Sequence, residues 1–197
     1  MSESPDPINE AFEQRCHPRQ FEEVCVLALD DDCSTNEVSW FSVGVDSKVR
    51  AGIRGFVFEL GQFNRHRPLE AGLGQLVEFM LPVCKGGGLL NWLHGQRFVE
   101  EWNRRGFLGI PPENFETEGE AVDALQTMLK ARRIRADLGR RLTNCGLSFT
   151  QIANEAGLFE HVVRRIAAGQ QEPSDAVAIL ISSALDSLTK SHVTDAD

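Results

Sequence analysis

The sequence has no apolar run long enough to cross a membrane. A membrane-spanning helix needs about 18 or more consecutive apolar residues, and no run among the 197 residues approaches that length. The first seven residues are polar and acidic, without the basic and apolar regions of a secretory signal. We therefore expect a cytoplasmic protein that makes no contact with a membrane.

Closely spaced cysteine pairs are also missing. The five cysteines are Cys16, Cys25, Cys33, Cys84 and Cys145. Their number is odd, their spacing is loose, and no two of them form a Cys-x-x-Cys pair. This pattern argues against a disulfide framework. It also lacks the two close ligand pairs of a structural zinc site, so we expect neither a metal nor another cofactor.

The sequence motifs of common enzymes are absent as well. The glycines at 86–88 follow Lys85, whereas a phosphate-binding loop places its lysine after the glycines. The sequence contains no Gly-x-Ser-x-Gly turn and no credible Cys/His catalytic pair. Three aspartates at 30–32 leave a Mg²⁺-dependent hydrolase as a remote alternative, although no second carboxylate motif follows them. We expect a protein that is not an enzyme.

Charge is distributed unevenly along the chain. The net charge is −9, which argues against a protein that coats nucleic acid. Residues 130–171 nevertheless carry a net charge of +5, whereas residues 1–129 carry −10. Arginine dominates the basic segment, and its planar guanidinium suits contacts to phosphates and base edges. The segment is either a nucleic-acid contact or a solvated helix face that balances the acidic remainder.

Three strands are expected in the first half of the chain. The continuous apolar run at 24–29 predicts a buried strand, and the stretches at 38–45 and 53–60 are rich in residues that favour strands. We see no long crossover between the first two strands, so we expect them to pair as an antiparallel hairpin.

Helical periodicity follows these strands. Apolar residues at helical spacing predict a helix at 73–81, ended by Pro82, and a second helix at 89–105 with Gly106 as its C-cap. The combination predicts an α+β domain over residues 20–108, which would serve in sensing or dimerisation.

Composition sets the remaining boundaries. Residues 1–19 are rich in Pro, Glu and Ser and predict a flexible lead-in with at most a short helix. The acidic Pro- and Gly-containing segment 109–119 predicts a linker. The helices of an all-α domain over 120–190 are expected at 120–145, with or without a break near Gly139, and at 149–156, 159–168 and 175–188. Residues 191–197 would be a frayed tail.

The spacing of residues 146–174 is typical of a helix-turn-helix. Ala153 provides the small side chain that two closely packed helices need, and Gly157, four residues later, suits the positive φ of a tight turn. Val163 and Ile166 are three residues apart and share a buried helix face. Ser148 and Gln151 have capping-box spacing before the first helix. The alternative is any small helical bundle whose turns fall at this spacing.

With these features, the segment resembles the lambda-repressor/Cro-type helix-turn-helix domain of phage, plasmid and bacterial regulators. The resemblance covers about residues 130–188 and includes a short polar exit from the second motif helix, Gly169-Gln-Gln-Glu-Pro173-Ser174. It does not extend to residues 1–119. It implies an all-α DNA-binding domain in a transcriptional regulator such as a repressor, acting as a dimer on a pseudo-palindromic site.

The resemblance also implies where DNA would be contacted. The starts of the two motif helices, which in the family usually carry polar side chains, hold Phe149 and Phe159, and Glu160 would face a phosphate-rich groove. The candidate DNA-contacting residues are Thr150, Gln151, His161, Arg164, Arg165, Arg140 and Arg141.

The two phenylalanines leave a second function open. Phe149 and Phe159 could contact thymine methyl groups, form a protein-contact surface, or help close a core. If they bind protein, the chain is an interaction adaptor or an acidic DNA mimic. If the segment binds duplex DNA, we expect a homodimer held largely by residues 20–105, with the acidic N-terminal domain also available to a protein partner.

Overall fold

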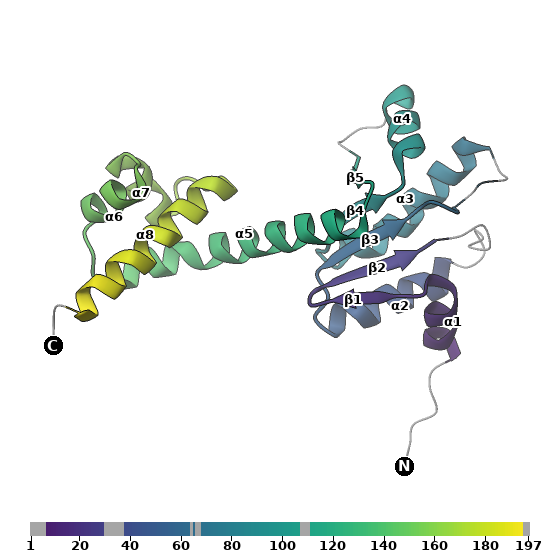
Figure 1. Ribbon diagram of the computed structural model, residues 1–197, viewed down its shortest axis with the longest axis horizontal. Helices are drawn as coiled ribbons and strands as arrows, with labels where there is room; N and C mark the ends of the chain where they lie inside the picture. The colour runs from purple at the N-terminus through teal and green to yellow at the C-terminus, as the bar shows by residue number, and fades with distance from the viewer. Residues whose placement is uncertain (1–6, 30–37, 64, 66–67, 107–110, 195–197) are drawn as a thin grey trace, which may run out of the picture. The chain divides into compact units, whose positions relative to one another are not determined.

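The computed structural model describes residues 7–29, 38–63, 65, 68–106 and 111–194. The chain divides into two compact units, Met1–Gln126 and Thr127–Asp197. The division lies inside helix α5 (Glu118–Asn144) rather than in an extended linker. The N-terminal unit mixes helices with a five-stranded sheet and the C-terminal unit is helical (Figure 1), which confirms the expected order of a mixed region followed by a helical one.

The sheet of the N-terminal unit has the strand order β1-β2-β3-β4-β5. Its strands are β1 (Arg19–Phe21), β2 (Val24–Ala28), β3 (Gly55–Glu59), β4 (Leu89–Leu93) and β5 (Glu113–Phe115). β1 pairs antiparallel with β2, and the other neighbours pair in parallel. The strands expected at 24–29 and 53–60 are confirmed as β2 and β3. The described part of the expected linker, residues 111–119, contains β5 and the start of α5.

Helices connect the parallel strands. The N-terminal unit contains α1 (Pro7–Cys16), α2 (Val38–Arg50), α3 (Leu69–Lys85) and α4 (Gln96–Arg105), in addition to the start of α5. α2, α3 and α4 each carry the chain from one parallel strand to the next. Crossover connections between parallel strands share one handedness. Because the strands lie in sequential order, this handedness places α2, α3 and α4 on the same face of the sheet. α1 accounts for ten residues of the expected lead-in.

The strand expected at 38–45 is wrong, because this stretch begins α2. Its buried residues are Trp40, Phe41, Gly44 and Val45, which follow the 3.6-residue period of a helix rather than the alternation of a strand. The antiparallel hairpin is therefore wrong too. Since α2 supplies a crossover, β2 and β3 pair in parallel, with Val24 opposite Gly55.

The helix expected at 89–105 is a strand followed by a shorter helix. β4 occupies the first five residues of this stretch, in which Asn91 is the one polar residue, and Gly95 separates it from α4. A Cβ on Gly95 would lie 3.0 Å from Leu60 and 3.1 Å from Trp92, so the chain passes too closely here for a larger residue. Gly106 is confirmed as the C-cap, with φ of 64°.

The helix at 73–81 is confirmed within α3, but it continues through Pro82 for a further turn.

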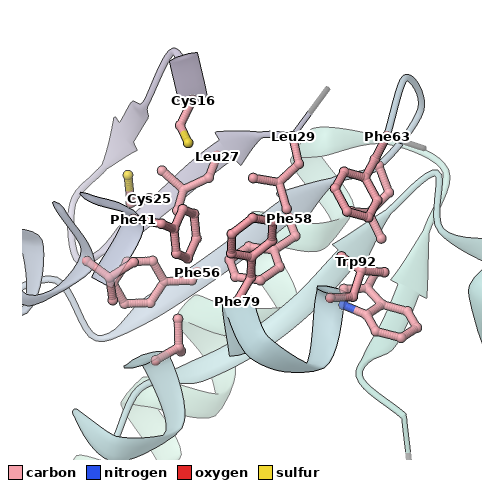
Figure 2. Packing of buried hydrophobic residues seen from close by; sticks show 14 of the residues in the cluster. Cys16, Cys25, Leu27, Leu29, Phe41, Phe56, Phe58, Phe63, Phe79 and Trp92 are labelled. Atoms are coloured by element: carbon pink, nitrogen blue, oxygen red, sulfur yellow. The ribbon is translucent and has the colours of Figure 1, made fainter. Parts of the chain in front are cut away.

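Aromatic side chains dominate the core between the sheet and helices α1 to α4. Figure 2 shows Phe56 and Phe58 of β3 beside Phe41 and Phe79 from the covering helices. The ring centroids of Phe41 and Phe79 are 4.5 Å apart, and those of Phe41 and Phe58 are 5.7 Å apart in an edge-on arrangement. Such contacts add to the stabilisation that burial of the rings already provides.

The opposite face of the sheet is covered by the start of α5. Asn91 is buried on β4, and its side-chain amide donates to the carbonyl of Ala121, 3.4 Å away. Ala121 and Leu125 are fully buried. Arg19 also pairs with Glu118 at the first residue of α5 and with Glu59 at 2.8 Å. The centre of the sheet is thus covered on both faces, as the apolar, buried runs of β2 and β3 require.

The C-terminal unit consists of the rest of α5 with α6 (Phe149–Ala156), α7 (Glu160–Ala167) and α8 (Asp175–Thr194). All four expected helices are confirmed, and α5 runs without a break through Gly139. α8 continues to Thr194, into the segment expected to be a frayed tail; residues 195–197 lie outside the described residues. Among the helices that the structure describes, none is long and apolar enough to cross a membrane.

Candidate nucleic-acid interface

The turn between α6 and α7 is built by Gly157. This residue adopts the left-handed conformation, with φ of 65° and ψ of 34°, which glycine reaches without steric cost. The amide of Leu158 donates to the carbonyl of Ala153 at 2.9 Å, and that of Gly157 donates to Asn154 at 3.3 Å. These bonds satisfy carbonyls at the end of α6. The predicted role of Gly157 is confirmed.

A capping box begins α6. The backbone amide of Gln151 donates to Ser148 Oγ at 3.2 Å, and the backbone amide of Ser148 donates to the side-chain oxygen Oε1 of Gln151 at 3.0 Å. The capping box expected from the sequence is confirmed. It commits the carbonyl oxygen of Gln151 to the helix end, so only the NH₂ group of that side chain is left to contact a ligand.

Apolar side chains from both helices fix how α6 and α7 pack. Ile152 and Val163 are fully buried, while Ala153 and Ile166 are 2% and 5% exposed. All four belong to one core cluster with residues of α5 and α8. The face of α7 that carries Val163 and Ile166 therefore points inward, as predicted. His161, Arg164 and Arg165 are exposed.

An ion pair connects successive turns of α7 and also reaches α6. Arg164 Nη2 donates to Glu160 Oε1 at 2.5 Å, and Thr150 Oγ1 donates to Glu160 Oε2 at 2.6 Å. Both oxygens of the carboxylate are engaged. The hydrogen bond from Thr150, followed by that from Arg164, lowers the pKa of Glu160 below its usual value. Sequence reasoning named Glu160 only as an unfavourable charge and missed this network.

The two phenylalanines lie in different environments. Phe149 is half-buried against the core cluster, and its ring centroid lies 5.5 Å from the guanidinium carbon of Arg164. Phe149 thus helps to close the core and supports Arg164 by a cation–π contact. Phe159 is 75% exposed, and its ring stacks on His161 with a centroid distance of 5.7 Å and an interplanar angle of 19°.

The remaining arginine candidates divide into one unpaired side chain and two paired ones. The Arg165 side chain makes no hydrogen bond or ion pair with the residues that the structure describes. Arg140 is 75% exposed and pairs with Asp137 of its own helix at 2.5 Å. Arg141 is 30% exposed and connects α5 to α8, donating to Ser182 Oγ at 2.6 Å and to Asp186 at 2.5 Å.

These contacts bring Phe149, Thr150, Glu160 and Arg164 into one cluster, beside the Phe159–His161 stack. Arg140 and Arg141 have no contact with that cluster and bind other partners. In the part of the chain that is described, no group of three or more His, Cys, Asp or Glu residues could hold a metal ion.

No protein-family model matches this sequence, and no curated protein is recognisably similar to it.

Proposed function

We propose that α6 and α7 form a helix-turn-helix and that the C-terminal unit binds duplex DNA in transcriptional control. The observation that carries this proposal is the division of α7 into two faces. Val163 and Ile166 are buried, while His161, Arg164 and Arg165 are exposed. A recognition helix needs this division, because one face holds the helix on its domain while the other enters the major groove.

The exposed side chains suit different parts of a duplex. The Arg165 side chain has no partner within the described residues, so its charge is available to a phosphate. Arg164 is held by Glu160 and Phe149, and a guanidinium held in one orientation suits a directional contact to a base edge. Thr150, Gln151 and Arg140 are exposed and would contact the DNA backbone. Arg141 serves to hold α5 and α8 together.

A second copy of the chain is part of the proposal. One recognition helix reads too few base pairs for useful specificity, so proteins of this kind act as dimers on sites with two-fold symmetry. The basic segment 130–171 carries a net charge of +5 and repels its own copies, so we place the dimer contact outside it. The N-terminal unit would supply the dimer contact and sense a ligand or bind a protein partner.

The alternative function is that of a protein-interaction adaptor. The 75% exposure of Phe159 favours it, because a large exposed apolar side chain is a common anchor in protein interfaces. The pairing of Arg164 with Glu160 also favours it, since this pairing neutralises one of the cations on α7.

Replacing Arg165 tests the DNA-binding proposal. Fluorescence anisotropy of a labelled duplex, titrated with the full chain at several salt concentrations, should show weaker binding by Arg165→Ala and a salt slope flatter by about one unit. Arg50→Ala is the matched control, because Arg50 is an exposed arginine on α2 with no partner in the described structure. It should bind as the wild type does. Equal effects of the two variants, or no duplex binding at low salt, would overturn the proposal.

A further inference from the structure

Phe159 has a position that helix stability does not explain. It is the N-cap of α7 and makes no side-chain capping bond, although Ser, Thr, Asp or Asn at this position would satisfy a free amide. At 75% exposure it is also the most exposed of the large hydrophobic side chains in the described residues. The ring therefore contributes little to the fold and is accessible to a ligand.

The surroundings of the ring restrict what it can contact. His161 stacks against one face of the ring and restrains its orientation. The carboxylate of Glu160, the next residue, already accepts hydrogen bonds from Thr150 and Arg164. Because that carboxylate is satisfied, the exposed ring of Phe159 offers an apolar surface for contact at the start of α7.

We propose that Phe159 recognises the C5-methyl group of a pyrimidine, which is thymine in unmodified DNA. This inference rests on the proposed DNA binding of α7. The N-terminal residues of a recognition helix contact base edges in the major groove. The base edges there present hydrogen-bond acceptors, amino donors and one apolar group, the methyl of thymine.

The energetics of burial favour that methyl group over the polar edges. A phenyl ring placed against N7, O6 or O4 would remove an acceptor from water and offer it no donor, which is unfavourable. Against a methyl group, the same ring removes apolar surface from water on both sides. Phe159 therefore favours a site with a thymine opposite the start of α7. 5-Methylcytosine carries the same methyl group and would satisfy the same contact.

Deoxyuridine isolates this contact, because it differs from thymidine only by the missing methyl group. Duplexes bound by the full chain are first selected from a randomised library, and each thymine of the selected site is then replaced singly by deoxyuridine. At one thymine in each half-site, the replacement should lower wild-type affinity about three- to fivefold. Phe159→Ala should bind the thymine and deoxyuridine duplexes equally well. A second comparison places cytosine or 5-methylcytosine at the same position. The methyl group of 5-methylcytosine should raise the affinity of the wild type and leave that of Phe159→Ala unchanged.

Two further variants separate recognition from folding. Phe159→Ser places a capping residue at the start of α7, so it should keep or raise helix stability while abolishing the sensitivity to the methyl group. Phe21→Ala removes another exposed phenylalanine, on β1, and should keep that sensitivity.

The outcomes distinguish this inference from the proposed function. Sequence-specific binding that is insensitive to deoxyuridine at every thymine would overturn the methyl contact and leave DNA binding intact. Methyl sensitivity that persists in Phe159→Ala would also overturn it, and the ring would then be free for a protein partner. If the wild type binds no duplex at low salt, the proposed function itself fails.

Discussion

Glu160 and Arg164 lie one turn apart on α7, with 2.5 Å between Oε1 and Nη2. Because the other carboxylate oxygen accepts a hydrogen bond from Thr150, this pair also connects the starts of α6 and α7. An ion pair between exposed side chains adds little to stability. It orients one guanidinium and offsets its charge, so we expect a larger effect on the proposed DNA binding than on stability.

Replacing Glu160 should therefore raise affinity and reduce selectivity. In Glu160→Gln, the positive charge of Arg164 is no longer offset by the carboxylate, and the side chain loses the ion pair that orients it. We expect tighter binding to unrelated duplexes, a salt slope steeper by about one unit, and weaker discrimination among sites. Anisotropy titrations with selected and scrambled duplexes measure all three.

The control for that variant is Glu172→Gln. It changes the net charge equally, and Glu172 is exposed with no cationic partner in the described structure. Equal changes in the two variants would show that Glu160 acts only through net charge and that its pairing with Arg164 has no role in selectivity.

Arg141 and Arg140 should differ in their effect on stability. Arg141→Ala removes hydrogen bonds to Ser182 and Asp186 between α5 and α8, and it should destabilise the C-terminal unit by about 1–2 kcal/mol. Arg140→Ala should change stability little, because Arg140 pairs only with Asp137 at the surface.

The tryptophans allow the two units to be followed separately. All three, Trp40, Trp92 and Trp102, belong to the N-terminal unit. Helical circular dichroism reports on both units, because each contains helices. In urea, Arg141→Ala should move the part of that signal that arises from the C-terminal unit to a lower urea concentration and leave the midpoint of tryptophan fluorescence in place. A common shift of both signals would contradict independent unfolding of the two units.

Two glycines should respond to alanine in opposite directions. Gly157→Ala places a side chain at φ of 65°, where space is open but the backbone conformation is unfavourable, and should cost about 1–2 kcal/mol. Gly139→Ala lies inside α5, also in open space, and should stabilise by about 0.5–1 kcal/mol. Thermal unfolding followed by circular dichroism measures both changes, and a tolerated alanine at 157 would contradict the turn geometry.

The cysteines should differ in reactivity. Burial raises the pKa of the Cys25 thiol to about 11, and the side chain is fully buried on β2. Cys84 is exposed on α3. Since the thiolate is the reactive form, iodoacetamide at mildly alkaline pH should modify Cys84 well before Cys25. Peptide mass spectrometry after short exposure measures this, and comparable labelling of the two would contradict the described core.

The C-terminal helices were predictable because their ends carry local signals. Ser148 caps α6 and Gly157 ends it, so α6 begins and ends at the predicted residues. In the N-terminal unit such signals were weaker. The stretch at 38–45 is rich in strand-forming residues, yet contacts of Trp40 and Phe41 with the core favour a helix, and with that helix comes the crossover that makes the sheet parallel.

The candidate site shows the same contrast. The pairing of Glu160 with Arg164 follows from a spacing of four residues on a helix and could have been found in the sequence. The bond from Thr150 to Glu160 joins two helices across a turn, and the bonds of Arg141 reach residues 41 and 45 positions away. Contacts of this kind depend on tertiary packing, which local periodicity does not determine.

A salt titration of the full chain against its selected duplex and a scrambled one tests DNA binding by the C-terminal unit. If the C-terminal unit binds DNA through α7, the logarithm of the affinity should fall linearly with the logarithm of salt concentration, with a slope of several units, and the selected duplex should bind more tightly throughout. Absence of binding to either duplex at about 10 mM salt, where charges are screened least, would contradict the account.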